Sequence, residues 1–209
     1  MIKKIFLKNL ANIITLIRVI LIFIVLLFLS DRTVWVRMCG GILLVVAFVL
    51  DGIDGILAKV LHISNNIGSL IDTLGDRITE NVLLVFFAYN KVIPLAVPVI
   101  FIARSFMADF IRFLAFKRGI GTFSITCSRI GSCLVASRTS RVTYLFLKFF
   151  VFFAGALLVI YQEARIGNVV YLPTLIVYAA IIATLMNLVR FVVLVYDSRD
   201  ILRQTFVTE

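Results

Sequence analysis

The sequence predicts an all-α integral membrane protein with six transmembrane helices and one amphipathic helix on the membrane surface. Composition is the first evidence, because the 209 residues are 62% hydrophobic and have a mean hydropathy of +1.13. Soluble domains are only about 45–50% apolar. The second observation is a series of apolar segments about 20 residues long, the length that crosses a bilayer. The third is the uneven placement of basic residues between these segments.

The predicted elements follow one another with short connections. Residues 1–10, MIKKIFLKNL, mix lysines with large apolar side chains, a pattern typical of an amphipathic helix at the membrane surface. The six predicted spans then cover residues 12–30, 36–59, 67–89, 92–114, 142–162 and 171–196. Pro94 and Pro98 are expected near the start of the fourth span, where a missing N–H costs least. No internal repeat is visible, so residues 1–209 are interpreted as a single membrane-embedded domain.

Basic residues predict the orientation of the chain. With the N-terminus inside, twelve lysines and arginines lie on the cytoplasmic side and four on the other. This bias places both termini and the polar segment 115–141 in the cytoplasm. The net charge of +10 is then explained by cytoplasmic loops near anionic lipid, and no nucleic-acid partner is expected. The expected location is a bacterial cytoplasmic membrane.

Four aspartates interrupt the apolar sequence: Asp51, Asp54, Asp72 and Asp76. A charged side chain at the bilayer centre costs about 2.5–3.5 kcal/mol on insertion scales, so a cluster of carboxylates requires a positive partner. Spacings of three and four place each pair on one helix face, and the turn between the two spans would bring the faces together. Oxygen ligands favour Mg²⁺ or Mn²⁺, and two such ions suit displacement at phosphorus. The alternative is that each carboxylate simply reaches water beside Lys59 or Arg77.

This segment resembles the signature of the CDP-alcohol phosphatidyltransferases, D-x2-D-G-x2-A-R-x8-G-x3-D-x3-D. Besides the four aspartates, the chain supplies Gly55, Ala58 and Gly68 at the required positions, and Lys59 stands where the family has arginine. Lysine keeps the charge but loses the bidentate fork. The resemblance covers 26 residues and agrees with the family's hydrophobic membrane fold.

The resemblance implies a role for each matching residue. Asp51, Asp54 and Asp72 would bind the two metal ions, and Asp76 would bind metal and also accept the proton of the incoming hydroxyl. The residues that would surround the CDP moiety of the donor are Gly55, Ala58, Lys59 and Gly68. The implied reaction is attack by an alcohol on the lipid-bearing phosphate of CDP-diacylglycerol, with release of CMP. A homodimer is also implied.

The acceptor alcohol is indicated by arginines. The segment NIITLIR, ending at Arg18, is similar to the N-x-x-T-x-x-R opening of phosphatidylglycerophosphate synthases within this family. Arg104, Arg138 and Arg141 are candidates for a cationic pocket, which would suit a phosphate-bearing acceptor. Glycerol 3-phosphate is the expected acceptor, and inositol phosphate, serine, choline or ethanolamine are alternatives. A divalent-cation transporter using the same carboxylates is the alternative from another class.

Overall fold

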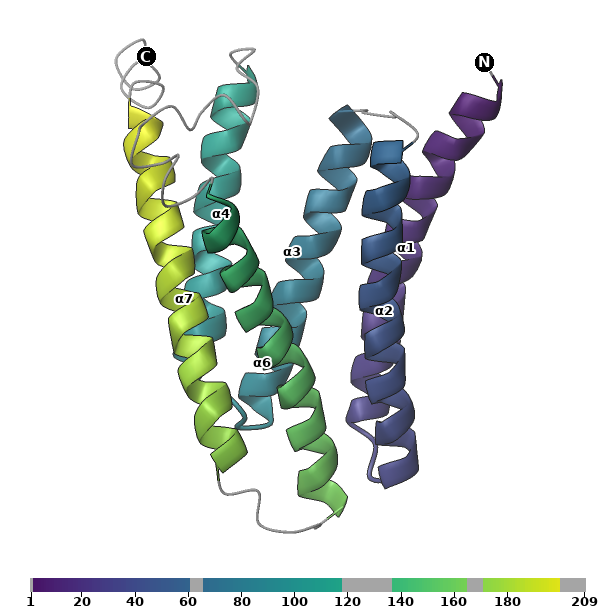
Figure 1. Ribbon diagram of the computed structural model, residues 1–209, viewed down its shortest axis with the longest axis vertical. Helices are drawn as coiled ribbons and strands as arrows, with labels where there is room; N and C mark the ends of the chain where they lie inside the picture. Colours follow the sequence, from purple (N-terminus) through teal and green to yellow (C-terminus); the bar gives the residue numbers. More distant parts are fainter. Residues whose placement is uncertain (1, 61–65, 118–136, 165–170, 200–209) are drawn as a thin grey trace. The chain divides into compact units, whose positions relative to one another are not determined.

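The computed structural model describes residues 2–60, 66–117, 137–164 and 171–199. The side chains of 2–12, 53–60, 66–72, 115–117, Arg138 and Arg141 lie outside that description. All regular secondary structure in the described ranges is helical, which confirms the all-α prediction (Figure 1). The helices are α1 (Ile2–Leu29), α2 (Val34–Val60), α3 (Asn66–Tyr89), α4 (Ala96–Lys117), α6 (Arg138–Ala164) and α7 (Tyr171–Asp197).

The predicted spans overlap these helices, but α6 begins at Arg138, four residues before the predicted span. Two further differences concern α1 and α4. The first is that α1 runs without a break from Ile2, so residues 1–10 do not form a separate surface helix in the described part of the chain. The second is that α4 begins at Ala96 rather than at residue 92. Pro94 precedes that start and Pro98 lies in the first turn, where its missing N–H removes no intrahelical hydrogen bond.

Within the described residues, three helical segments are long and apolar enough to cross a membrane: Val34–Gly52, Val142–Ala164 and Tyr171–Asp197. Ile13–Leu29 is a shorter apolar helix. Large apolar side chains also point outward, and Leu27, Ile42 and Phe106 are each more than three-fifths exposed. Exposed apolar surface of this extent marks a face that meets lipid or protein rather than water, so the chain has the character of an integral membrane protein.

Contacts divide the chain into two compact units, Met1–Val92 with Phe153–Val169, and Ile93–Phe152 with Val170–Glu209. In the first unit, α1 packs against α2 and α3. The second half of α6 packs against this unit at two glycines, where there is no room for a larger side chain. A Cβ built on Gly41 would lie 3.1 Å from Ile160, and one built on Gly155 would lie 3.1 Å from the Phe87 ring.

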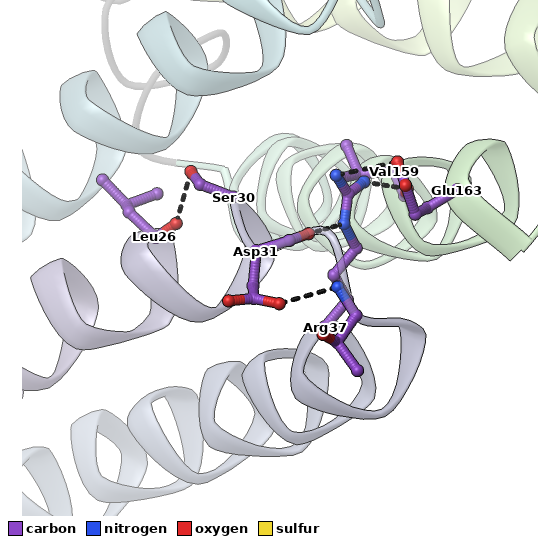
Figure 2. A network of polar contacts seen from close by, with 7 residues as sticks. Leu26, Ser30, Asp31, Arg37, Val159 and Glu163 are labelled. Atoms are coloured by element: carbon purple, nitrogen blue, oxygen red, sulfur yellow. Dashed lines mark hydrogen bonds and ion pairs between the residues drawn. The ribbon is translucent and has the colours of Figure 1, made fainter.

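A polar network holds the end of α6 to the turn between α1 and α2 (Figure 2). Arg37 of α2 donates from Nε to the carbonyl oxygen of Asp31. Its Nη1 donates to the carbonyl oxygen of Val159 at 2.8 Å, and its Nη2 lies 3.1 Å from Glu163 Oε2. Asp31 in turn accepts a 2.6 Å hydrogen bond from the backbone N–H of Thr33, which directs the chain into α2. One largely enclosed guanidinium therefore joins three segments of the first unit.

In the second unit, α4 packs against α7, and α7 also contacts the start of α6. Arg190 of α7 donates from Nη2 to the Ser140 carbonyl oxygen at 2.9 Å and lies 3.1 Å from the Ser140 hydroxyl oxygen. Its guanidinium carbon lies 4.5 Å from the centre of the Tyr144 ring, within the range of a cation–π interaction. These contacts fix the first turns of α6.

Candidate active site

The backbone places all four aspartates on helices, as their spacing predicts. Asp51 and Asp54 lie near the C-terminal end of α2, and Asp72 and Asp76 lie in the N-terminal half of α3. The two helices are separated by only five residues. A connection this short keeps the end of α2 close to the start of α3, so the two acidic segments lie near each other.

Arg18 of α1 brings two of these aspartates together. Its Nη1 forms an ion pair with Asp51 Oδ1, and its Nη2 donates to Asp76 Oδ1 at 2.8 Å. The Arg18 side chain is 3% exposed, whereas the side chains of Asp51 and Asp76 are 36% and 53% exposed. The guanidinium is thus enclosed, while both carboxylates remain accessible from solvent.

The other half of the predicted aspartate set falls outside the described side chains. Asp54 and Asp72 lie on the helical backbone of α2 and α3, but their side chains are not described. The same holds for the residues expected around the nucleotide, which are Gly55, Ala58, Lys59 and Gly68. Among the side chains that the structure describes, no three His, Cys, Asp or Glu residues gather to hold a metal ion. The four-carboxylate arrangement therefore stays a prediction.

The described part of the site nevertheless fits a divalent cation. Asp51 and Asp76 come from different helices and converge on one cationic group. Both are oxygen donors, which Mg²⁺ and Mn²⁺ prefer. Their contacts with Arg18 use Oδ1 in each case, and a carboxylate has a second oxygen with further acceptor capacity.

The candidate acceptor residues belong to the second unit. Arg104 lies on α4 and is 9% exposed, and the neighbouring Ser105 is 4% exposed. Arg138 and Arg141 lie in the first turn of α6, with side chains outside the description. Asp109, also on α4, pairs with Arg112 at 3.1 Å. The cationic pocket remains untested, since only one of its three arginines has a described side chain.

The contacts of Arg18 and Gly75 at this site were not predicted from the sequence. An arginine within an apolar segment must find a partner, and this was the signal available from sequence. Which partner it finds could not be derived, because Asp76 lies 58 residues away. Gly75 carries no catalytic group, and its importance follows only from its contact with α1.

Comparison with known proteins identifies the class. The family model of the CDP-alcohol phosphatidyltransferases matches residues 8–199, and the chain belongs to this family. Two bacterial proteins named CDP-diacylglycerol–glycerol-3-phosphate 3-phosphatidyltransferase are similar to it. The one from Mycoplasma genitalium is 30% identical over 81 residues, 39% of this chain and 34% of that protein. The one from Bacillus subtilis is 28% identical over 116 residues, 50% of this chain and 60% of that protein. The matched segments thus span about a third and three-fifths of these relatives.

Proposed function

We propose that this protein is a phospholipid-synthesising enzyme that transfers the phosphatidyl group of CDP-diacylglycerol to glycerol 3-phosphate and releases CMP. Family membership over residues 8–199 supports the reaction type. The observation that carries the proposal is the convergence of Asp51 and Asp76, from α2 and α3, on one enclosed cation. These two residues are the first and last aspartates of the family signature.

The metal chemistry is assigned to the four aspartates. Asp51, Asp54, Asp72 and Asp76 hold two Mg²⁺ or Mn²⁺ ions in this proposal. When bound, such ions neutralise the diphosphate and stabilise the attacking and leaving oxygens. The exposure of Asp51 and Asp76 supports it, because ions and a water-soluble nucleotide need access to their carboxylates.

Asp76 is the proposed general base. The acceptor hydroxyl oxygen forms a bond to the lipid-bearing phosphorus, and the bond from that phosphorus to the bridging diphosphate oxygen breaks. CMP leaves with the bridging oxygen and its electron pair, while the hydroxyl proton passes to the Asp76 carboxylate. Asp76 is 53% exposed, so an acceptor can approach within the hydrogen-bond distance that proton transfer requires.

The donor and acceptor are assigned to separate groups of residues. Gly55, Ala58, Lys59 and Gly68 surround the CDP moiety, with the lysine ammonium on a phosphate oxygen. Arg104, Arg138 and Arg141 bind the phosphate of glycerol 3-phosphate, since arginine suits bidentate contacts to phosphate. The names of the two bacterial relatives support this acceptor over inositol phosphate, serine, choline and ethanolamine.

The membrane arrangement is part of the same proposal. The six described helices cross the bilayer, both termini and the active site face the cytoplasm, and residues 1–209 act as one domain in a homodimer in a bacterial cytoplasmic membrane. The basic residues of the predicted cytoplasmic segments support this orientation.

An acceptor panel tests the proposed function. Purified protein in lipid nanodiscs receives CDP-diacylglycerol, Mn²⁺ and one acceptor at a time: glycerol 3-phosphate, inositol phosphate, serine, choline or ethanolamine. Glycerol 3-phosphate is expected to give the fastest CMP release, with phosphatidylglycerophosphate as the lipid product. CMP release with a different acceptor would overturn the substrate assignment. Mn²⁺ flux into liposomes without CMP release from any acceptor would favour a transporter instead.

A further inference from the structure

Arg18 reaches from α1 to the two acidic helices of the proposed metal site. Its two terminal nitrogens contact different carboxylates, Nη1 that of Asp51 and Nη2 that of Asp76, the latter at 2.8 Å. A guanidinium has a rigid planar fork of donors, so the distance between its nitrogens limits how far the two carboxylates can separate. Arg18 thereby fixes the spacing of one acid on α2 and one on α3.

Close packing between α1 and α3 holds Arg18 in place. Gly75 precedes Asp76, and a Cβ built on it would lie 2.8 Å from Thr15 Cγ2 and 3.2 Å from Arg18 Nη2. Thr15 lies one turn before Arg18 on the same helix and is 4% exposed. The missing side chain at Gly75 therefore allows α1 and α3 to approach closely enough for the guanidinium to reach Asp76.

We propose that Arg18 is a positioning residue for the metal ions, which rests on the proposed function of the four aspartates. It binds Oδ1 of Asp51 and Oδ1 of Asp76 from the enclosed side, and this orients the second oxygen of each carboxylate toward the ions. Groups that hydrogen-bond metal ligands in this way typically change metal affinity by about 10- to 100-fold when they are removed.

The charge of Arg18 supports the same role. Without a cation between them, carboxylates on neighbouring helices repel one another and favour separation of the helices. Arg18 reduces that repulsion before any metal binds. Because its guanidinium is on the enclosed side and both carboxylates remain partly exposed, it can remain in place when ions arrive. A cation that occupied the position of the metal ions would instead have to leave before those ions could bind.

Mn²⁺ binding tests this inference directly. Electron paramagnetic resonance titration of the purified full-length chain with Mn²⁺ alone, without donor or acceptor, measures affinity apart from activity. Arg18→Met should weaken Mn²⁺ binding about 10- to 100-fold. Arg18→Lys should recover part of the loss, because lysine keeps the charge but loses the fork. Gly75→Ala should also weaken binding by displacing the guanidinium, and it provides a second variant if Arg18→Met does not fold.

Arg37 and Gly52 offer matched controls. Arg37 is another largely enclosed arginine paired with a carboxylate in the same unit, but it contacts Asp31, Val159 and Glu163 rather than the aspartate signature. Arg37→Met should lower thermal stability and leave Mn²⁺ affinity unchanged. Among the residues that the structure describes, nothing outside its own helical turn lies within 4 Å of a Cβ built on Gly52, next to Asp51, so Gly52→Ala should not change Mn²⁺ affinity.

Different results would contradict the positioning role of Arg18 and the proposed function. Unchanged or tighter Mn²⁺ binding by Arg18→Met and Gly75→Ala would overturn the inference, and tighter binding would identify Arg18 as a competing cation. An equal loss of affinity in Arg37→Met would overturn it as well, because any damage to the fold would then suffice. If Asp51→Asn binds Mn²⁺ as tightly as the parent, the metal site itself is misassigned, and both proposals fail.

Discussion

At the residue scale, Asp76 is the residue on which the proposed chemistry depends most. Its carboxylate is 53% exposed and is oriented by Arg18 at 2.8 Å. Asp76→Asn removes the basic oxygen while preserving size, and a positioned general base contributes about 10²–10⁴-fold to rate. CMP release by this variant should fall by at least about 100-fold.

Asp109→Asn is the control for that substitution. Asp109 is also a half-exposed aspartate paired with an arginine, Arg112, at 3.1 Å, but it has no role in the proposed chemistry. Its variant should keep CMP release near the parental rate. Equal losses in the Asp76 and Asp109 variants would argue that the assay reports on folding rather than on a base.

Arg18 illustrates what could be predicted from sequence at this scale. The signature spacing was sufficient to nominate the four aspartates and to place them on helices. The partners of a buried arginine depend instead on how α1 packs against α2 and α3. That packing is governed by close contacts such as the one at Gly75, which no local pattern encodes.

At the element scale, the C-terminus of α3 carries a residue in an unusual conformation. Lys91 has φ 59°, and the N–H of Val92 donates to the Phe87 carbonyl oxygen at 2.8 Å while that of Lys91 donates to the Ala88 carbonyl oxygen. This is a Schellman ending, which usually has glycine at the position of Lys91.

Lys91→Gly should therefore stabilise the protein, by up to about 1 kcal/mol after the entropic cost of glycine is included. Thermal unfolding in detergent measures the effect. The neighbouring Asn90→Gly serves as the control, because it removes a side-chain hydrogen bond of 2.9 Å to the Phe86 carbonyl oxygen and should destabilise. A decrease in melting temperature for Lys91→Gly would contradict the strain argument.

The turn between α1 and α2 predicts a dependence on pH. The backbone N–H of Thr33 lowers the pKa of Asp31 below its ordinary 3.8, and Arg37 acts in the same direction. A lowered pKa in the folded state stabilises the protein above the unfolded pKa, and the contribution is lost as pH falls through the folded value. The folded protein therefore loses this stabilisation as the pH falls below 3.8.

Melting temperatures of the parent and of Asp31→Ala should reveal this effect. The difference between the two proteins should be largest above pH 3.8 and should shrink as the pH falls below that value. Subtracting the melting temperature of Asp31→Ala from that of the parent at each pH removes the effect of the other carboxylates, which titrate in both proteins. A difference that is constant from pH 7 down to pH 2 would show that the ionised carboxylate does not stabilise the turn.

Helix boundaries were the most predictable feature of the fold. The predicted spans 36–59, 67–89 and 171–196 differ from α2, α3 and α7 by no more than two residues at either end. Long apolar runs with polar flanks determine both where a span is predicted and where the helix begins and ends. The break expected after residue 10 is absent, since nothing in that segment stops a helix from continuing into α1. The network of Arg37 with Val159 joins residues 122 apart and was not predictable from local sequence.

At the scale of the whole molecule, the proposed orientation can be tested by cysteine labelling. In a cysteine-free background, Arg32→Cys in the turn between α1 and α2 should react with a membrane-impermeant maleimide from outside. Arg199→Cys, just after α7, should react only after the membrane is permeabilised. Both positions are exposed, so access depends on the side of the membrane. The reverse pattern would place the acidic site on the outer face and exclude a cytoplasmic nucleotide donor.

In the proposed function, the aspartates form a metal-dependent site for phosphatidyl transfer to glycerol 3-phosphate. The most direct measurement is glycerol 3-phosphate-dependent CMP release by the purified protein before EDTA, after EDTA, and after Mn²⁺ is restored. We expect activity to disappear with EDTA, to return with Mn²⁺, and to stay absent in Asp76→Asn at every stage. CMP release that persists in EDTA, or that Asp76→Asn performs as fast as the parent, would contradict the account.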